Sequence, residues 1–133
     1  GAKLVAGGGW PAGLDRGFYF EPTILTDVAP DSTIAQEEVF GPVLSVLRYS
    51  DDDDAVRIAN NSQYGLSGAV WGTDVDRAVA VARRIRTGQI AVNGFGPGGA
   101  PFGGFKQSGF GRESGGIIGI RQYMEPKAMG LPV

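Results

Sequence analysis

Two carboxylates and an aromatic ring occur together in the stretch Glu37-Glu38-Val39-Phe40-Gly41-Pro42. An ionised glutamate accepts hydrogen bonds on two oxygens, so it can hold a vicinal diol such as that of a ribose. A phenyl ring two residues later can cover a flat apolar ligand. Gly41 allows close backbone approach, and Pro42 fixes φ before an apolar run. The stretch indicates a nucleotide grip, although a solvated helix end beside a packed phenylalanine would have the same sequence.

The residue types that are missing exclude several chemistries. The chain has no Cys and no His, so it offers no thiolate nucleophile, no His-based triad and none of the usual zinc ligand sets. Acid–base work would fall to Asp, Glu, Lys, Arg or Tyr. The net charge is −2 and no Lys/Arg cluster occurs, so we expect neither nucleic acid nor a membrane among the partners.

Length and composition are those of one globular domain. The chain has 133 residues, of which 42% are hydrophobic and 20% charged. This balance supports a hydrophobic core and argues against disorder. Because the sequence opens on Gly1 without an initiator Met, we expect a piece of a longer protein.

The first half predicts short strands around one short helix. Residues 3–6 are a strand candidate, and residues 18–20 followed by 23–25 favour a second extended segment. Asp31 or Ser32 is placed to cap a helix over residues 33–37. The apolar, β-branched run 43–49 predicts a strand buried on both faces.

The second half alternates helices and strands. Four aspartates, Asp51 to Asp54, precede an apolar helical pattern, and they suit an N-cap and first turn better than a metal site. Thr73 or Asp74 can cap a second helix, and Gly88 is a natural residue after its end. The expected elements are a helix to about residue 60, a strand over 66–71, a helix that ends near Arg83, Arg84 and Arg86, a strand over 89–93, a short helix within 114–123 and an extended tail over 124–131.

The order strand, helix, strand, helix, strand from Val43 onward predicts a parallel α/β sheet. Ten of the 23 glycines lie between Gly94 and Gly116, in a loop after the last predicted strand. Ligands gather at such loops, but the spacing matches neither a P-loop nor a dinucleotide-binding glycine motif. Alternatively the loop is an ordered connection whose aromatic residues, Phe95, Phe102 and Phe105, pack into the core.

Four stretches together resemble the C-terminal quarter of NAD(P)-dependent aldehyde dehydrogenases. They occur in the order of that family and span nearly the whole chain. They are Gly17-Phe18-Tyr19-Phe20-Glu21-Pro22-Thr23-Ile24-Leu25, Gln36-Glu37-Glu38-Val39-Phe40-Gly41-Pro42-Val43, Ala59-Asn60-Asn61-Ser62-Gln63-Tyr64-Gly65-Leu66, and Pro101-Phe102-Gly103-Gly104-Phe105-Lys106-Gln107-Ser108-Gly109 with Gly111-Arg112-Glu113.

The resemblance implies an α/β fold with a partial parallel sheet and flanking helices, plus a C-terminal oligomerisation strand. Residues 1–122 would be the C-terminal portion of the catalytic domain. Residues 123–133 would be the strand and tail that pair with a neighbouring subunit. It also implies NAD or NADP as the cofactor of the full-length enzyme, a small-molecule aldehyde as substrate, a homo-oligomer and a cytoplasmic location.

The resemblance also implies roles for single residues. Glu38 resembles the glutamate that binds the hydroxyls of the nicotinamide ribose, and Phe40 the aromatic residue beside the nicotinamide ring. Asn93, Phe95 and Phe102 resemble the wall of the tunnel through which the aldehyde enters, while core packing stays open for Phe102.

In that family a Cys thiolate attacks the aldehyde, the thiohemiacetal gives hydride to the nicotinamide, and a Glu-activated water releases the acid. The Cys and the Glu of that mechanism correspond to positions upstream of Gly1. This chain therefore contributes no catalytic residue and is expected to be inactive alone. Two alternatives remain: a CoA-dependent or acyl-phosphate reductase on the same fold, or a non-catalytic domain for nucleotide binding or assembly.

Overall fold

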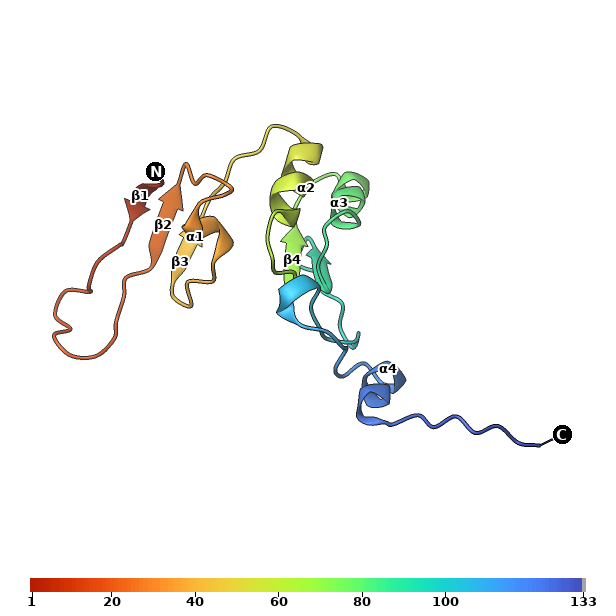
Figure 1. The fold of residues 1–133 in the computed structure, drawn as a ribbon. Coiled ribbons are helices and arrows are strands. Elements are labelled where there is room, and N and C mark those ends of the chain that lie inside the picture. Colours follow the sequence, from red (N-terminus) through yellow and green to blue (C-terminus); the bar gives the residue numbers. More distant parts are fainter. Residues whose placement is uncertain (133) are drawn as a thin grey trace. The chain divides into compact units, whose positions relative to one another are not determined.

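The computed structural model describes residues 1–132, which fall into two compact units, residues 1–61 and residues 62–132. Each unit combines short strands with short helices, which confirms the expected α/β class (Figure 1). Within residues 1–132 no helix is both long enough and apolar enough to cross a bilayer.

The first unit is built on a three-stranded mixed sheet in the order β1-β2-β3. β1 runs antiparallel to β2, and β3 runs parallel to β2. Thr23 and Val28 are buried in this unit, as is Val56. In chain order its elements are β1 (Lys3–Ala6), β2 (Thr23–Thr26), α1 (Thr33–Gln36), β3 (Val43–Ser45) and α2 (Asp52–Asn60).

Two predicted strands in this unit are shorter than expected or absent. The run 43–49 forms a strand only over β3, and its Leu44 is exposed instead of buried. The reason is topological, because β3 is an edge strand of its sheet and pairs only with β2. Residues 18–20 carry no strand, and their aromatic side chains are exposed.

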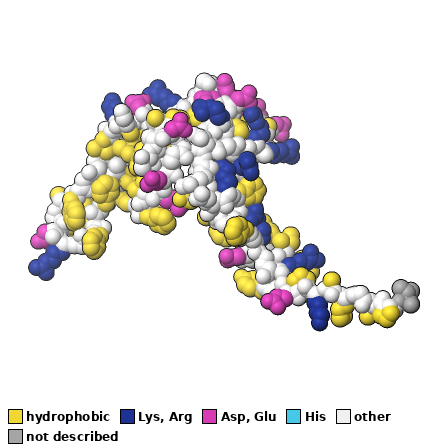
Figure 2. All heavy atoms as spheres, in the orientation of Figure 1, with side chains coloured by type: hydrophobic (Ala, Val, Ile, Leu, Met, Phe, Trp, Pro, Cys, Tyr) yellow, Lys and Arg dark blue, Asp and Glu magenta, His cyan; other side chains and the backbone are white. Residues whose placement is uncertain are grey.

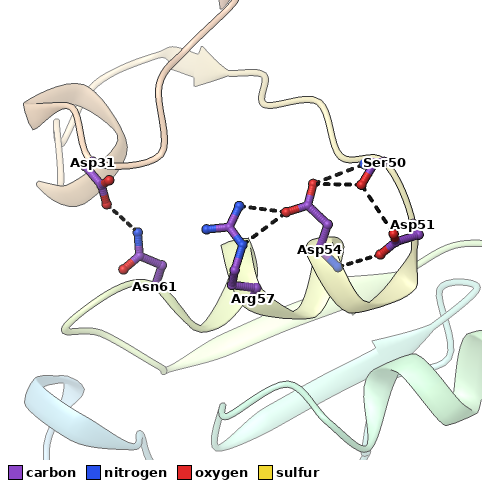
Figure 3. Close-up of polar contacts among 6 residues, drawn as sticks. All are labelled: Asp31, Ser50, Asp51, Asp54, Arg57 and Asn61. Carbon is purple, nitrogen blue, oxygen red and sulfur yellow. Dashed lines mark hydrogen bonds and ion pairs between the residues drawn. The ribbon is translucent and has the colours of Figure 1, made fainter.

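The acidic run Asp51 to Asp54 starts helix α2, as predicted. The Asp51 carboxylate accepts a hydrogen bond from the Asp54 backbone N–H at 2.8 Å. The Asp54 carboxylate in turn accepts from Arg57 at 2.6 and 3.1 Å and from the Ser50 backbone N–H at 3.1 Å (Figure 3). These bonds satisfy otherwise free donors at the helix start and place negative charge at the positive end of the helix dipole.

The second unit is built on two parallel strands joined through a helix. β4 and β5 pair from Ser67 opposite Gln89 to Val70 opposite Val92. The parallel strand–helix–strand order is confirmed, although the strands of the chain are divided between two sheets. In chain order the elements are β4 (Ser67–Val70), α3 (Val75–Ala82), β5 (Gln89–Val92), the 3-10 helix η1 (Lys106–Ser108), α4 (Ile117–Ile120) and the 3-10 helix η2 (Arg121–Tyr123).

Helix α3 follows its predicted pattern at the start and departs from it at the end. Asp74 caps it by accepting from the Arg77 backbone N–H at 3.0 Å, and Ala78 and Ala82 are buried four residues apart. The helix ends at Ala82, so Gly88 is not its terminating residue. Gly88 instead lies against the loop after β5, where an added Cβ would collide with the Gly103 carbonyl oxygen.

The C-terminal region contains less helix than predicted. The expected helix within 114–123 appears as one turn of α4 followed by η2. Residues 124–132 are exposed and carry no strand within this chain (Figure 1). A strand that forms by pairing with a neighbouring subunit therefore stays a prediction, as does the expected boundary at residue 123.

Candidate functional site

A pocket of about 360 Å³ surrounds the Glu-Glu-Val-Phe-Gly stretch in the first unit. This volume lies within the range of small-ligand sites. Most of its wall is the segment 37–41 that links α1 to β3, and we call this segment the pocket segment. The lining residues are Ile34, Glu37, Glu38, Val39, Phe40, Gly41, Val43 and Ser45.

Glu38 and Phe40 line the same pocket, as the nucleotide-grip interpretation requires. Among residues 1–132, Glu38 forms no hydrogen bond or ion pair, so both carboxylate oxygens can accept from a ligand. The Phe40 side chain is 91% exposed and its backbone φ is +52°. The pocket therefore offers an acceptor for hydroxyl groups and an uncovered aromatic face.

The ends of the pocket segment are held by backbone contacts. Glu37 follows the last turn of α1, where its N–H donates to the Thr33 carbonyl at 2.9 Å. At the other end the Thr23 N–H donates to the Pro42 carbonyl at 2.8 Å, next to the parallel pairing of β2 with β3. The sequence predicted Glu38 and Phe40, but it missed Ile34, Val43 and Ser45. Helical spacing could not have identified Ile34, because α1 ends at Gln36 and Glu38 lies beyond it.

The predicted tunnel residues lie in the second unit. The Asn93 side chain is held by two hydrogen bonds. Its amide oxygen accepts from the Gly72 N–H and its amide nitrogen donates to the Gly72 carbonyl, both at 2.9 Å. This pair joins the carboxyl ends of β4 and β5. Asn93 therefore holds the base of the loop that follows it, and its predicted contact with a substrate stays untested.

Asn93 and Gly94 form a tight turn that reverses the chain after β5. Their φ values are +49° and +83°, and Phe95 and Val92 exchange backbone hydrogen bonds of 2.9 and 3.3 Å. Asn-Gly is the favoured pair for such a turn, because both positions need positive φ. The turn presents the Phe95 ring with 85% of its surface exposed, so Phe95 does not pack into a core of this chain.

Phe102 sits in a second backbone-paired loop. Phe102 and Glu113 exchange two backbone hydrogen bonds of 2.7 Å, and the Phe102 side chain is 43% exposed. Arg112 donates to the Gly104 carbonyl at 3.0 Å and lies 5.3 Å from the centre of the Phe105 ring. The Lys106 ammonium donates to the Ser62 carbonyl at 2.7 Å. Both cations brace the loop.

The described residues hold no cluster of acidic side chains that could bind a metal. The pKa of Asp54 is lowered, first by its hydrogen bond from Arg57 and then by the hydrogen bond from the Ser50 backbone N–H. Both contacts belong to the start of α2, so this shift is structural. Glu38 and Phe40, which line the pocket, are therefore the candidate ligand contacts of this chain.

Comparison with known proteins agrees on one family. A model of the aldehyde dehydrogenase family matches residues 1–129. Geranial dehydrogenase of Castellaniella defragrans is 56% identical over 115 residues, which cover 86% of this chain and 24% of that protein. Betaine aldehyde dehydrogenase of Bacillus subtilis is 48% identical over 131 residues, which cover 96% of this chain and 26% of that protein.

Solved structures give the same result. An aldehyde dehydrogenase of Mycobacterium tuberculosis in complex with NAD+ superposes with a TM-score of 0.88 at 49% identity, covering 100% of this chain and 28% of that one. A mutant aldehyde dehydrogenase of Pseudomonas syringae in complex with NAD+ and octanal superposes with a TM-score of 0.87 at 48% identity, covering 94% and 26%. The chain thus spans about a quarter of the length of these relatives.

Proposed function

The chain belongs to the aldehyde dehydrogenase family, and on this premise we propose that it forms part of an enzyme that oxidises an aldehyde to a carboxylic acid with NAD+ or NADP+. The nucleophilic cysteine and the basic glutamate of that reaction lie outside this chain, which has no Cys. We infer that this chain alone does not catalyse the reaction, and that its part is to hold the cofactor and to shape the aldehyde path.

The observation that carries the proposal is the pocket shared by Glu38 and Phe40. The cofactor, when bound, accepts a hydride at its nicotinamide ring. Glu38 would hold the two hydroxyls of the adjoining ribose, because its carboxylate has two acceptor oxygens and no protein partner within residues 1–132. Phe40 would lie against the nicotinamide through its exposed ring face. These contacts fix the orientation of the ring without taking part in bond making.

Phe95 and Phe102 are proposed to line the aldehyde path. Both rings are partly or largely exposed on loops that follow β5. Both loops are held by backbone pairs, so the rings are presented from fixed positions. The proposed substrate is an aldehyde, as the names of two relatives, geranial dehydrogenase and betaine aldehyde dehydrogenase, suggest.

We also propose that the enzyme is a homo-oligomer. The tail from Tyr123 carries exposed apolar side chains, among them Met124, Met129 and Leu131. Met124 has extended backbone angles, with φ −110° and ψ 142°. An extended, apolar and unpaired segment is suited to adding a strand to the sheet of another subunit.

The test is Glu38→Gln in the full-length enzyme. Glutamine keeps the shape but loses the negative charge, so the charge-assisted bonds to the ribose weaken by about 1–3 kcal/mol. We expect a slower first turnover, measured by rapid mixing as NADH formation. Asp15→Asn, which removes the same charge from an exposed loop position, is the control. A Glu38→Gln enzyme with the first-turnover rate of the wild type would contradict the proposal.

A further inference from the structure

The pocket segment begins at the end of α1, a helix too short to be stable without further contacts. Helix α1 has four residues, and its N-cap residue Ser32 makes no side-chain capping bond. A single isolated turn is unstable, because helix nucleation costs more than one hydrogen bond returns. The upstream end of the pocket segment therefore needs an anchor outside α1.

Gln36, the last residue of α1, supplies that anchor. Its amide nitrogen donates to the Pro30 carbonyl at 2.6 Å and to the Asn61 carbonyl, 25 residues later in the chain, at 2.6 Å. Both partners are acceptors, so the NH₂ group and not the oxygen must face them. Each N–H of that group has its own carbonyl partner, and the side chain is half-buried.

A neighbouring side-chain bond supports the same junction. The Asn61 amide donates to the Asp31 carboxylate at 2.7 Å, and Figure 3 shows these two groups pointing toward one another. Asn61 is the residue that ends α2. The loop before α1 and the end of α2 are thus joined twice, through Gln36 and through Asn61. We call these four residues, Pro30, Asp31, Gln36 and Asn61, the α1 latch.

We propose that Gln36 is a positioning residue for cofactor binding, acting through the α1 latch on Glu38 and Phe40. The inference rests on the proposed function of the pocket. Glu38 lies two residues beyond Gln36, and no side-chain bond of its own fixes it within residues 1–132. Its direction is therefore set by the backbone on its two sides, and the end of α1 is the nearer of the two anchors. Losing the latch lets the pocket segment sample other positions, and the cofactor must then order it on binding.

The experiment compares three substitutions in the full-length enzyme. Gln36→Glu keeps the size but sets a carboxylate against two carbonyl oxygens, and Gln36→Met removes the donors without adding charge. Gln36→Lys restores donors to both carbonyls. We expect the dissociation constant of NAD+, measured by calorimetry, to rise about tenfold in Gln36→Glu and Gln36→Met. In Gln36→Lys it should stay within about threefold of wild type.

Ser32→Ala is the matched control. The Ser32 hydroxyl donates to the Ala29 carbonyl at 2.7 Å, so this variant removes one side-chain bond of similar length from the same region but leaves the latch intact. Its NAD+ affinity should equal that of wild type. A role in stability alone would lower the melting temperature of the Gln36 variants and leave their NAD+ affinity unchanged.

The possible outcomes distinguish the proposed role of the α1 latch from the proposed cofactor-binding role of Glu38. Weaker NAD+ binding in Gln36→Glu and Gln36→Met, rescued in Gln36→Lys, supports the proposal. If Glu38→Gln weakens NAD+ binding while Gln36→Met and Gln36→Lys bind NAD+ equally well, the latch proposal is wrong and the pocket assignment stands. If Glu38→Gln binds NAD+ as wild type does, the proposed function fails first. Should Gln36→Glu not fold, the Met and Lys pair decides.

Discussion

Phe40 holds a left-handed backbone conformation that bulky residues rarely adopt. Such conformations cost about 1–3 kcal/mol and gather at ligand sites, where surrounding contacts maintain them. The sequence predicted that the ring of Phe40 faces a ligand. It did not predict the strained backbone, because Gly41, the next residue, is the one that ordinarily takes positive φ.

Asn93 illustrates a role that could not be predicted from its place in the sequence. The resemblance put it in the tunnel wall, whereas its amide pairs with both backbone groups of Gly72. The sequence does not show that Gly72, 21 positions earlier, lies beside Asn93 where the two strands end. Only the register of β4 against β5 brings the two together.

The substitution Asn93→Gly tests the two side-chain hydrogen bonds while the turn keeps its backbone conformation. Glycine tolerates the φ of +49°, so the variant loses the two hydrogen bonds without adding backbone strain. We expect faster amide hydrogen exchange at Gly72 in the full-length enzyme, corresponding to a loss of about 1–3 kcal/mol in the free energy of local opening.

Asn93→Ala adds the cost of a left-handed alanine. Its local opening should be easier than that of the glycine variant by about 1 kcal/mol. Unchanged protection of the Gly72 amide in both variants would show that the amide pair does not hold the ends of β4 and β5 together.

At the scale of elements, the helix starts were predictable because capping depends on neighbouring residues. Asp51 and Asp74 cap α2 and α3, and the buried Ala78 and Ala82 follow the helical period. The lengths of strands were less predictable. The run 43–49 has the composition of a buried strand, but β3 pairs on one side only, which the sequence does not show.

The start of α2 gives a prediction of pH dependence. Arg57 and the Ser50 N–H lower the pKa of Asp54 from its ordinary 3.8 in the folded state. The folded state therefore favours the ionised form. The resulting stability is fully present above the unfolded pKa and is lost as the pH falls through the lower folded pKa.

Asp54→Asn in the full-length enzyme should consequently melt at a lower temperature than wild type at pH 5 to 7. The two melting temperatures should converge below about pH 4. Arg57→Gln should behave in the same way, because it removes the first cause of the shift. A constant difference between Asp54→Asn and wild type across this range would mean that the shifted carboxyl does not contribute.

At the scale of the whole molecule, the chain leaves much of its apolar surface open. Within residues 1–132 no large side chain is completely buried, and hydrophobic side chains lie exposed over both units on the face drawn in Figure 2. An ordinary monomer exposes far smaller contiguous patches. This agrees with a chain that spans about a quarter of its relatives' length.

The site could be predicted from the sequence only in part. Glu38 and Phe40 were predicted together and line one pocket, because they are neighbours in the chain. Asn93, Phe95 and Phe102 belong to the other unit, and their role as tunnel residues stays a prediction. The composition excludes a cysteine nucleophile within this chain and does not identify an aldehyde.

The most direct measurement is the crystal structure of the full-length enzyme with bound NAD+. We expect a Glu38 carboxylate oxygen within hydrogen-bond distance of the nicotinamide ribose hydroxyls, about 2.5–3.0 Å, and the Phe40 ring in contact with the nicotinamide. A cofactor whose ribose is held by other residues, with the Glu38 carboxylate in bulk water, would contradict the account.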